Sequence, residues 1–323
     1  MFSRNRAALL TVLTHSVLLA IAASYAFAQR PQPTPTPDEG RNITINTDLV
    51  TLTLTVTDNY GRYVSGLTKK AFRIFDEGEE QEITFFSDSD APASVGILFD
   101  ISGSMSGEKI AKARVALTKF IENSHPNDEY FLIAFNKRAQ LLLDRTRDAE
   151  AVLQKLTLVQ PRESTALYDA VYLGLERVSR GAHQKKALLI ISDGQDNSSR
   201  YNFREVKRLM KESDIVTYAV GILDRGDVSS GLGLLGQAFL DELTSVTGGR
   251  SFYPNSNAEM DEIFERIALE LRHQYSIGYT PPNFKPDGSW RKVRVKVNPP
   301  RGLPRLTVRS REGYYATPFS EIR

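Results

Sequence analysis

The sequence of 323 residues contains no cysteine. This absence excludes disulfide bonds, metal sites built from thiolates, cysteine nucleophiles and a lipid-modified cysteine. The fold must therefore be stabilised by its own hydrophobic core, which a chain of this length can supply. Hydrophobic residues make up 41% of the sequence and charged residues 25%, which is usual for a folded protein.

Several motifs that mark common enzyme classes are also missing. There is no Walker phosphate-binding loop and no His-Glu-x-x-His pair. A nucleophile elbow requires Gly-x-Ser-x-Gly, whereas residues 103–107 carry Met105 at the centre of that pattern. The histidines after residue 28 are widely separated, and we expect surface or capping roles for all of them: His125, His183 and His273.

The first 28 residues have the pattern of a secretory signal peptide. Arg4 and Arg6 precede a mostly apolar stretch, and Ala26-Phe27-Ala28 is a small-residue cleavage signal. An uncleaved membrane anchor is the alternative, because the apolar stretch approaches the length that spans a bilayer. Polar residues within the stretch favour cleavage. We therefore expect an exported protein, periplasmic or secreted, with no stable membrane span after cleavage.

Beyond residue 28 the chain has no net charge, because 39 basic residues balance 39 acidic ones. A neutral chain exerts no global attraction on nucleic acid, so we expect no nucleic-acid partner. The charge is unevenly distributed, however. Residues 38–90 carry 11 acidic and 5 basic side chains, whereas residues 272–323 carry 11 basic and 3 acidic ones.

The segment 29–40 is a proline-rich linker, which predicts an extended spacer. Residues 41–91 then alternate with the period of a β-strand, most clearly where apolar residues and threonines alternate over residues 50–57. We expect residues 72–76 and 82–86 to form a hairpin around the segment Glu77–Glu80.

Between residues 92 and 273 the pattern changes, because apolar runs alternate with segments of helical period. We expect strands within 95–99, 130–135, 187–191 and 215–222, an antiparallel edge strand at 139–143, and helices within 109–123, 167–178, 203–213, 239–247 and 258–272. Alternating strands and helices of this kind predict an α/β domain of the Rossmann-like class. Its doubly wound, mainly parallel sheet would carry helices on both faces.

The C-terminal segment 274–323 returns to the period of a strand. Small β segments cannot bury enough surface alone, and this segment has the opposite charge to residues 41–91. We therefore expect the two segments to pair into one small antiparallel β subdomain, with the α/β domain inserted between them. The alternative is two separate appendages, with Lys and Arg protecting exposed strand edges.

Oxygen-bearing side chains follow the apolar run 97–99. Asp100, Ser102 and Ser104 form an Asp-x-Ser-x-Ser pattern at the expected carboxyl end of a buried strand, where α/β sheets bind ligands. One carboxylate and two hydroxyls suit a hard divalent cation, and they poorly suit a nucleophile because no base lies nearby in sequence. The alternative is that these residues only cap a helix or form turns.

Two further segments carry oxygen atoms in the same way. Thr165 stands at the entry to an expected helix, and Asp193 ends a second apolar run. With these segments the chain resembles the von Willebrand factor type A family, whose metal-ion-dependent adhesion site combines Asp-x-Ser-x-Ser with a distant Thr and a distant Asp. The resemblance covers about residues 93–272, and the flanking β segments resemble exported bacterial relatives of that family.

The resemblance implies a metal site and a partner. It implies that Mg²⁺, with Mn²⁺ and Ca²⁺ as alternatives, is bound by five residues: Asp100, Ser102, Ser104, Thr165 and Asp193. Mainly neutral direct ligands leave much of the charge of the cation available, so a carboxylate of a partner protein, from Asp or Glu, would complete the coordination. The expected function is therefore metal-dependent protein binding, as in cell adhesion, and not catalysis.

Other features receive simpler interpretations. We expect Asp169 in the first turn of its helix, where the helix dipole favours a negative charge, and Asp196 in a solvated loop at the rim of the sheet. The tripeptide Arg225-Gly226-Asp227 is taken as a chance match to an integrin-binding sequence.

Two questions stay open from the sequence alone. A metal-dependent, phosphatase-like hydrolase is the alternative function, although Ser102 replaces the second Asp that a haloacid dehalogenase phosphatase requires. The last helix also runs almost directly into the strand at 275–279. It could therefore transmit ligand binding to the β subdomain or form a rigid joint with it.

Overall fold

A computed structural model describes residues 49–105, 107–159, 164–223, 231–282, 284–300, 302 and 305–317. These residues belong to one compact unit, Thr47–Arg323. The expected signal peptide (1–28), the proline-rich linker (29–40) and the tripeptide Arg225-Gly226-Asp227 lie outside the described residues. Of the helices in these ranges, none combines the length and the apolar character that a membrane crossing requires.

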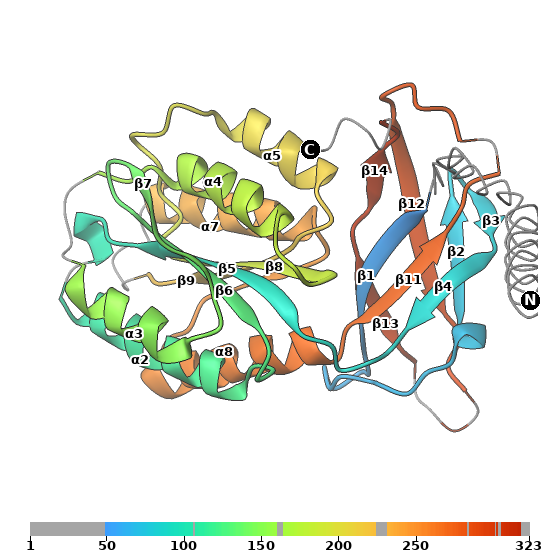
Figure 1. Cartoon of the computed structure of the whole chain (residues 1–323), viewed down its shortest axis with the longest axis horizontal. Helices are drawn as coiled ribbons and strands as arrows, with labels where there is room; N and C mark the ends of the chain where they lie inside the picture. Colours follow the sequence, from blue (N-terminus) through green and yellow to red (C-terminus); the bar gives the residue numbers. More distant parts are fainter. Residues whose placement is uncertain are drawn as a thin grey trace, which may run out of the picture. The chain divides into compact units, whose positions relative to one another are not determined.

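One six-stranded sheet forms the centre of the α/β domain (Figure 1). Its strands are β5 (Ala93–Asp100), β6 (Glu129–Phe135), β7 (Ala139–Thr146), β8 (Lys185–Ser192), β9 (Val216–Gly221) and β10 (Arg250–Phe252). They lie in the order β10-β9-β8-β5-β6-β7, and all neighbours are parallel except β7, which pairs antiparallel with β6. Every residue of β5, β6 and β9 is buried, as the unbroken apolar runs predict for strands covered on both faces.

Helices cover both faces of this sheet (Figure 1). One face packs against α2 (Glu108–Asn123), α3 (Ala149–Leu158) and α8 (Asn257–Arg272), and the other packs against α4 (Leu167–Ser179), α5 (Phe203–Glu212) and α7 (Gly231–Ser245). The predicted α/β class, with a mainly parallel doubly wound sheet, is therefore confirmed. The sequence patterns did not predict α3, and α7 begins at Gly231 instead of near residue 239.

The segments on either side of the α/β domain form two four-stranded antiparallel sheets. The first has the order β13-β1-β11-β4 and contains β1 (Val50–Thr57), β4 (Ile83–Ser87), β11 (Tyr275–Tyr279) and β13 (Thr307–Ser310). The second has the order β14-β12-β2-β3 and contains β2 (Phe72–Asp76), β3 (Glu79–Gln81), β12 (Trp290–Val297) and β14 (Gly313–Tyr315). A short 3-10 helix, η1 (Lys69–Ala71), precedes β2.

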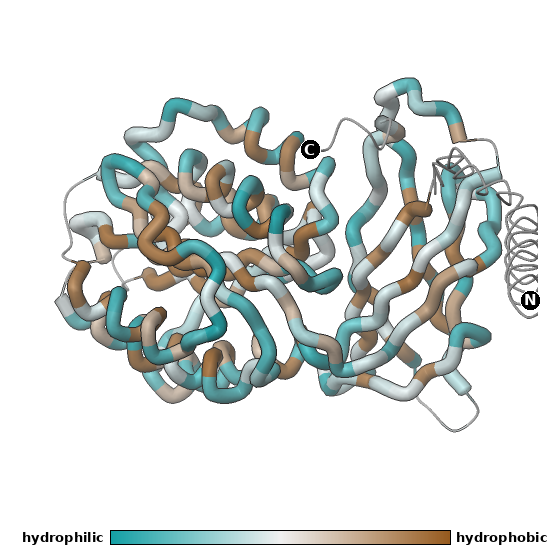
Figure 2. Tube along the Cα trace, in the orientation of Figure 1, coloured by the Kyte–Doolittle hydropathy of each residue, from teal (hydrophilic) through white to brown (hydrophobic). Residues whose placement is uncertain are grey.

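A shared apolar core holds these two sheets together as a β-sandwich. Leu52 of β1 and Ile277 of β11 pack in one cluster with Ile74 of β2 and Val293 of β12. Figure 2 shows bands of apolar and polar residues alternating along these strands, which is the pattern of strands with one buried face. The prediction that both terminal segments form one antiparallel β subdomain is therefore confirmed.

The predicted hairpin around Glu77–Glu80 has a different partner in the structure. Residues Phe72–Asp76 turn at Glu77 and Gly78 and pair with Glu79–Gln81, whereas Ile83–Ser87 crosses to the other sheet and pairs with β11. Both turn residues have positive φ, 49° for Glu77 and 92° for Gly78. A two-residue turn with this backbone joins adjacent antiparallel strands directly, so the partner strand begins at residue 79.

Backbone ladders and apolar packing join the two terminal segments, and opposite charge contributes little. β1 pairs with β11 and β13, and β2 pairs with β12. Among the described residues, the ion pair Arg272–Asp90 is the one that joins the acidic N-terminal segment to the basic C-terminal one. Both of its side chains are partly exposed, and exposed ion pairs contribute little to stability.

A buried carboxylate lies where the sandwich meets the α/β domain. Glu270 of α8 is 1% exposed and accepts hydrogen bonds from Tyr218 of β9 (2.8 Å) and from Tyr63 (3.0 Å). It also accepts hydrogen bonds from Thr55 of β1 (3.0 Å) and from Arg309 of β13. One carboxylate thus bonds to both parts of the molecule.

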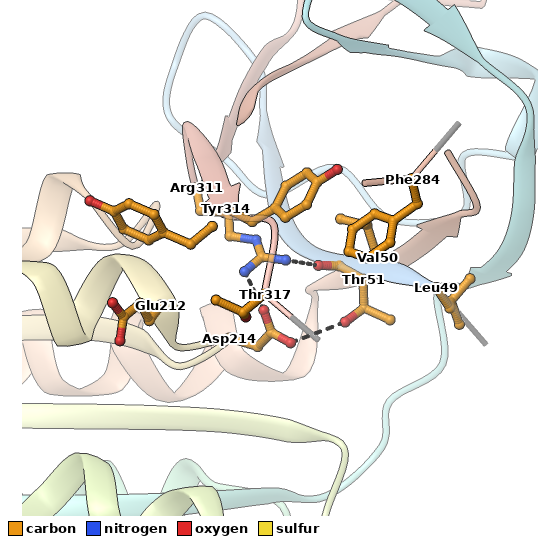
Figure 3. A pocket seen from close by; sticks show the side chains of 10 residues that line it. Leu49, Val50, Thr51, Glu212, Asp214, Phe284, Arg311, Tyr314 and Thr317 are labelled. Carbon is orange, nitrogen blue, oxygen red and sulfur yellow. Dashed lines mark hydrogen bonds and ion pairs between the residues drawn. The ribbon is translucent and has the colours of Figure 1, made fainter. Parts of the chain in front are cut away.

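A second polar contact lies at the edge of the same junction, around a cavity (Figure 3). The guanidinium of Arg311 forms an ion pair with Asp214, which precedes β9, and donates a hydrogen bond to the carbonyl of Thr51 (2.7 Å). The hydroxyl of Thr51 bonds to Asp214 in turn (3.3 Å). Thr51 and Thr55 of β1 therefore face the α/β domain, which explains why they alternate with the apolar core residues.

Candidate functional site

Two aspartates stand side by side at the carboxyl end of the parallel sheet. Asp100 is the last residue of β5, and Asp193 directly follows β8. The two strands are paired, with Phe99 opposite Ile191, so Asp100 lies beside Ser192. Asp100 and Asp193 are both fully buried. Two carboxylates in one buried place are unfavourable without donors or a cation to balance them.

Both carboxylate oxygens of Asp100 accept hydrogen bonds. The amide of Ser102 donates to Oδ1 (2.8 Å), and the hydroxyl of Ser192 donates to Oδ2 (2.6 Å). Burial raises the pKa of Asp100 to about 7, and the neighbouring charge of Asp193 contributes to this rise, while the hydrogen bonds from Ser192 and Ser102 oppose it. Ser192 was not among the predicted site residues, although its position directly before Asp193 places it on the strand beside Asp100.

The turn after β5 brings two hydroxyls together. Ser102 and Ser104 lie within or beside the 3-10 helix η2 (Gly103–Met105), and their hydroxyl oxygens are 3.0 Å apart. Met105 is fully buried in the core beneath α2 and anchors this turn. The position that excluded a nucleophile elbow thus has a packing role.

Asp193 has one oxygen with a hydrogen-bond partner and one without. Oδ1 accepts a hydrogen bond from the amide of Gln195 (3.1 Å), which makes a local turn as the simpler interpretation predicts. Oδ2 is buried and has no hydrogen-bond partner among the described residues. Buried polar atoms are seldom left in this state, so this oxygen is available to bind something else.

Thr165 reaches the same edge of the sheet through its backbone contacts. Its amide donates to the side chain of Asn197 (2.8 Å), and its carbonyl accepts from the amide of Asn197 (2.9 Å). The next residue, Ala166, donates to the carbonyl of Asn136 after β6 (2.7 Å). Thr165 is 3% exposed and is not the N-cap of α4, because that position belongs to Ala166.

The loop after Asp193 caps α4, a role that the sequence did not reveal. Asp196 accepts a hydrogen bond from the amide of Tyr168 (3.1 Å), and Ser199 accepts one from the amide of Asp169 (3.1 Å). The carboxylate of Asp169 in turn accepts hydrogen bonds from the amides of Arg200 and Tyr201. Asp169 lies in the first turn of its helix, as predicted, and Asp196 is a capping residue rather than merely a solvated one.

The histidines of the described residues take no part in this arrangement. His125 accepts a hydrogen bond from the amide of Asn127, and His273 stacks on Tyr63 at the sandwich junction. No group of three or more His, Cys, Asp or Glu side chains in the described part of the chain could hold a metal ion. A cation at the sheet edge would therefore depend on hydroxyl oxygens in addition to the two carboxylates.

Comparison with known proteins agrees with this arrangement of strands and loops. The family model for the von Willebrand factor type A domain matches residues 94–266. Inter-alpha-trypsin inhibitor heavy chain H4 of Bos taurus is 24% identical over 209 residues, which cover 59% of this chain and 22% of that protein. An uncharacterized protein of Borreliella burgdorferi is 28% identical over 141 residues, which cover 41% of each chain.

A solved structure, von Willebrand factor type A from Catenulispora acidiphila, has a TM-score of 0.48 at 12% identity. The match covers 75% of this chain and 73% of that one. This chain spans about a fifth of the length of the bovine relative.

Proposed function

Because this chain belongs to the von Willebrand factor type A domain family, whose members are mainly protein-interaction modules, we propose that the carboxyl edge of its α/β sheet binds a divalent cation and, through it, an acidic side chain of a partner protein. The residues proposed to hold the cation are Asp100, Ser102, Ser104, Thr165 and Asp193. Mg²⁺ is the preferred ion, with Mn²⁺ and Ca²⁺ as alternatives.

One observation carries this proposal. Oδ2 of Asp193 is a buried carboxylate oxygen without a hydrogen-bond partner among the described residues. It lies beside Asp100, whose own carboxylate is also fully buried. A divalent cation would neutralise both charges, and the hydroxyls of Ser102 and Ser104 would add the neutral oxygen ligands that Mg²⁺ and Ca²⁺ accept.

The donor set fits such an ion in its chemistry as well as in its charge. All five side chains offer oxygen, which hard cations prefer over nitrogen or sulfur. When bound, the ion would supply a Lewis-acidic position that attracts a carboxylate. The protein side chains would orient that position, because Ser192 fixes Asp100 and Asn197 fixes the backbone of Thr165.

We further propose that the protein works outside the cytoplasm, periplasmic or secreted. The support is the signal-like pattern of residues 1–28 and the absence of cysteine, which leaves no thiol to oxidise there. A fusion of residues 1–28 to a reporter that is active only after export tests this part. An inactive reporter would contradict it.

The test of the metal site is calorimetric titration of Mg²⁺ and Mn²⁺ into the purified protein. The wild type should bind one ion per chain. The variants Asp193→Asn and Ser102→Ala should lose most or all of their affinity for that ion. Asp88→Asn removes an exposed carboxylate outside the α/β domain and is the matched control. Absence of uptake by the wild type would refute the proposal. Turnover of a generic phosphate ester with Mg²⁺, lost in Asp193→Asn, would favour the alternative of a metal-dependent hydrolase.

A further inference from the structure

Two exposed basic residues lie in the turn beside Thr165. Lys137 and Arg138 connect β6 to β7, and both are exposed. The turn is fixed in place, because the carbonyl of Asn136 accepts a hydrogen bond from Ala166 (2.7 Å) and the amide of Asn136 donates to the carbonyl of Arg138 (3.3 Å). The backbone that carries these two cations is therefore held at the α4 N-terminus, next to the proposed metal ligand.

A third cation lies at the same helix end. Arg200 belongs to the loop that caps α4, and its Nε donates to the carboxylate of Asp169 (3.2 Å). Its side chain is nevertheless 85% exposed, whereas that of Asp169 is 10% exposed. The carboxylate thus orients the guanidinium from below and leaves the terminal nitrogens in solvent.

Two acidic side chains among the described residues at this helix end are already engaged by the backbone. Asp196 accepts from the amide of Tyr168, and Asp169 accepts from the amides of Arg200 and Tyr201. The side chains of Lys137 and Arg138 have no ion-pair partner in the described part of the chain. Exposed cations without an ion-pair partner attract an anionic partner.

The charge balance of the proposed metal site suggests what these three cations do. The bound ion attracts a carboxylate that is in contact with it, but Asp100 and Asp193 balance its two charges, so the loaded site adds little net charge that acts on a partner from a distance. Lys137, Arg138 and Arg200 supply that attraction instead. A partner with one isolated carboxylate would use the metal and leave all three unused.

Resting on the proposed function, we infer that the partner presents a run of several acidic residues rather than a single one. One carboxylate binds at the metal, and its neighbours pair with Lys137, Arg138 and Arg200. An acidic polypeptide segment is the occupant, because a carboxylate is both the ligand proposed for the metal and a suitable partner for a guanidinium. The interaction weakens with added salt, since these cations are exposed.

The test titrates hexaglutamate into the Mg²⁺-loaded protein, with N-acetylglutamate and hexaglutamine as comparison probes. The double variant Lys137→Gln, Arg138→Gln should bind hexaglutamate about tenfold more weakly, as expected for the loss of two exposed ion pairs. Its affinity for N-acetylglutamate and its uptake of Mg²⁺ should stay unchanged. Lys69→Gln, Lys70→Gln removes an adjacent exposed pair in the sandwich and should behave as the wild type.

The outcomes separate this inference from the proposed function. If the wild type takes up Mg²⁺ but the double variant binds hexaglutamate as tightly as the wild type, or if neither binds it, the inference is wrong and the metal site stands. If the wild type takes up no divalent ion, the proposed function fails and the inference fails with it. Tight binding of inorganic polyphosphate without Mg²⁺, lost in the double variant, would assign these cations to a phosphate polymer and overturn the inference.

Discussion

The hydroxyl of Thr55 donates to the carboxylate of Glu270 at 3.0 Å, although 215 residues separate the two in sequence. Thr55 belongs to the first strand of the sandwich, and Glu270 belongs to the last helix of the α/β domain. Tyr218 of the central sheet and Arg309 of β13 bond to the same carboxylate. The C-terminal end of α8 is therefore fixed to both parts of the molecule, which favours a rigid joint over a mobile last helix.

Glu270→Ala should strongly destabilise the protein. Removal of the carboxylate leaves the guanidinium of Arg309 partly buried without its partner, and loss of one member of a buried ion pair costs about 3–5 kcal/mol. Urea unfolding of Glu270→Ala, measured by circular dichroism, should show this loss of stability. The sandwich and the α/β domain of the variant should unfold in separate transitions. Glu262→Ala removes an exposed carboxylate from the same helix and serves as the control. Equal stability of the two variants would contradict the role given to Glu270.

The metal-free protein should become less stable as the pH rises from about 5 to about 7.5. The folded-state pKa of Asp100 is raised to about 7 by burial, whereas a carboxyl in an unfolded chain titrates near about 4. Between these values the folded state binds the proton more tightly than the unfolded state does. Stability is therefore highest below the unfolded value and is lost as the pH rises through the folded one, by about 1.4 kcal/mol per pKa unit.

The measurement for this prediction is chemical unfolding across the pH range with and without Asp100→Asn. The variant has no carboxyl to titrate at this position, so its stability should change less than that of the wild type over the same range. A wild type that is equally stable throughout, or more stable at the higher pH, would show that the Asp100 proton is not held in this way.

Asp193→Asn should raise the stability of the metal-free protein while removing its uptake of metal. The buried Oδ2 of Asp193 carries charge without a donor, so neutralising the side chain removes a penalty of about 1 kcal/mol. Asp128→Asn is the matched opposite, because the buried carboxylate of Asp128 accepts hydrogen bonds from the amides of Ala93 (2.6 Å) and His125 (3.1 Å). Thermal unfolding in a chelator should move the two variants in opposite directions. A destabilised Asp193→Asn would argue that Asp193 is a structural residue.

Asn197→Ala should weaken metal uptake without touching the metal ligands. The side chain of Asn197 holds the amide of Thr165, and loss of a residue that positions a ligand typically costs about 10- to 100-fold in affinity. We expect a loss near the lower bound, because the backbone bond from Asn197 to the carbonyl of Thr165 remains. Asn59→Ala, in an exposed turn of the sandwich, should leave the affinity unchanged. Calorimetry with Mn²⁺ reports both variants.

The sequence predicted the elements whose burial pattern is simple. β5 and β9 are apolar throughout because both faces are covered, and β1 alternates because one face is buried in the sandwich. The partner of β2 was mispredicted because β3 consists of Glu79, Glu80 and Gln81, which carry no strand signal of their own. The pairing there is set by the positive φ of Glu77. Glutamate seldom adopts a positive φ, so the sequence gives no sign of this turn.

The start of α7 was missed for a different reason. Glycines at 231, 233 and 236 predict a loop, yet all three lie in the helix. A Cβ on Gly236 would come within 2.5 Å of the carbonyl oxygen of Asp193, so this glycine allows the helix to approach the candidate site closely. Close contact between distant segments overrides local helix propensity here.

A sequence motif predicted the five candidate site residues, but it did not predict the residues that position them. Ser192, Asp196 and Asn197 act through hydrogen bonds to Asp100, Tyr168 and Thr165, which are distant in sequence. Polar residues in a loop have many possible partners, and only the folded sheet determines which are used. The fold also brings Lys137 and Arg138 beside the α4 N-terminus, although nothing in their local sequence indicates it.

The pairing of β4 with β11 places Ser87 opposite Ser276, so the chain leaves the sandwich for the α/β domain and re-enters it on neighbouring strands. The whole α/β domain is therefore an insertion between two neighbouring antiparallel strands, so its two ends lie as close together as the ends of a hairpin loop. A short turn between these strands could replace it, and a different domain with adjacent termini could be grafted in its place. Such an exchange would leave Arg309 and Arg311 of the sandwich without their carboxylate partners in the α/β domain, so these two residues would have to be redesigned together with the insertion.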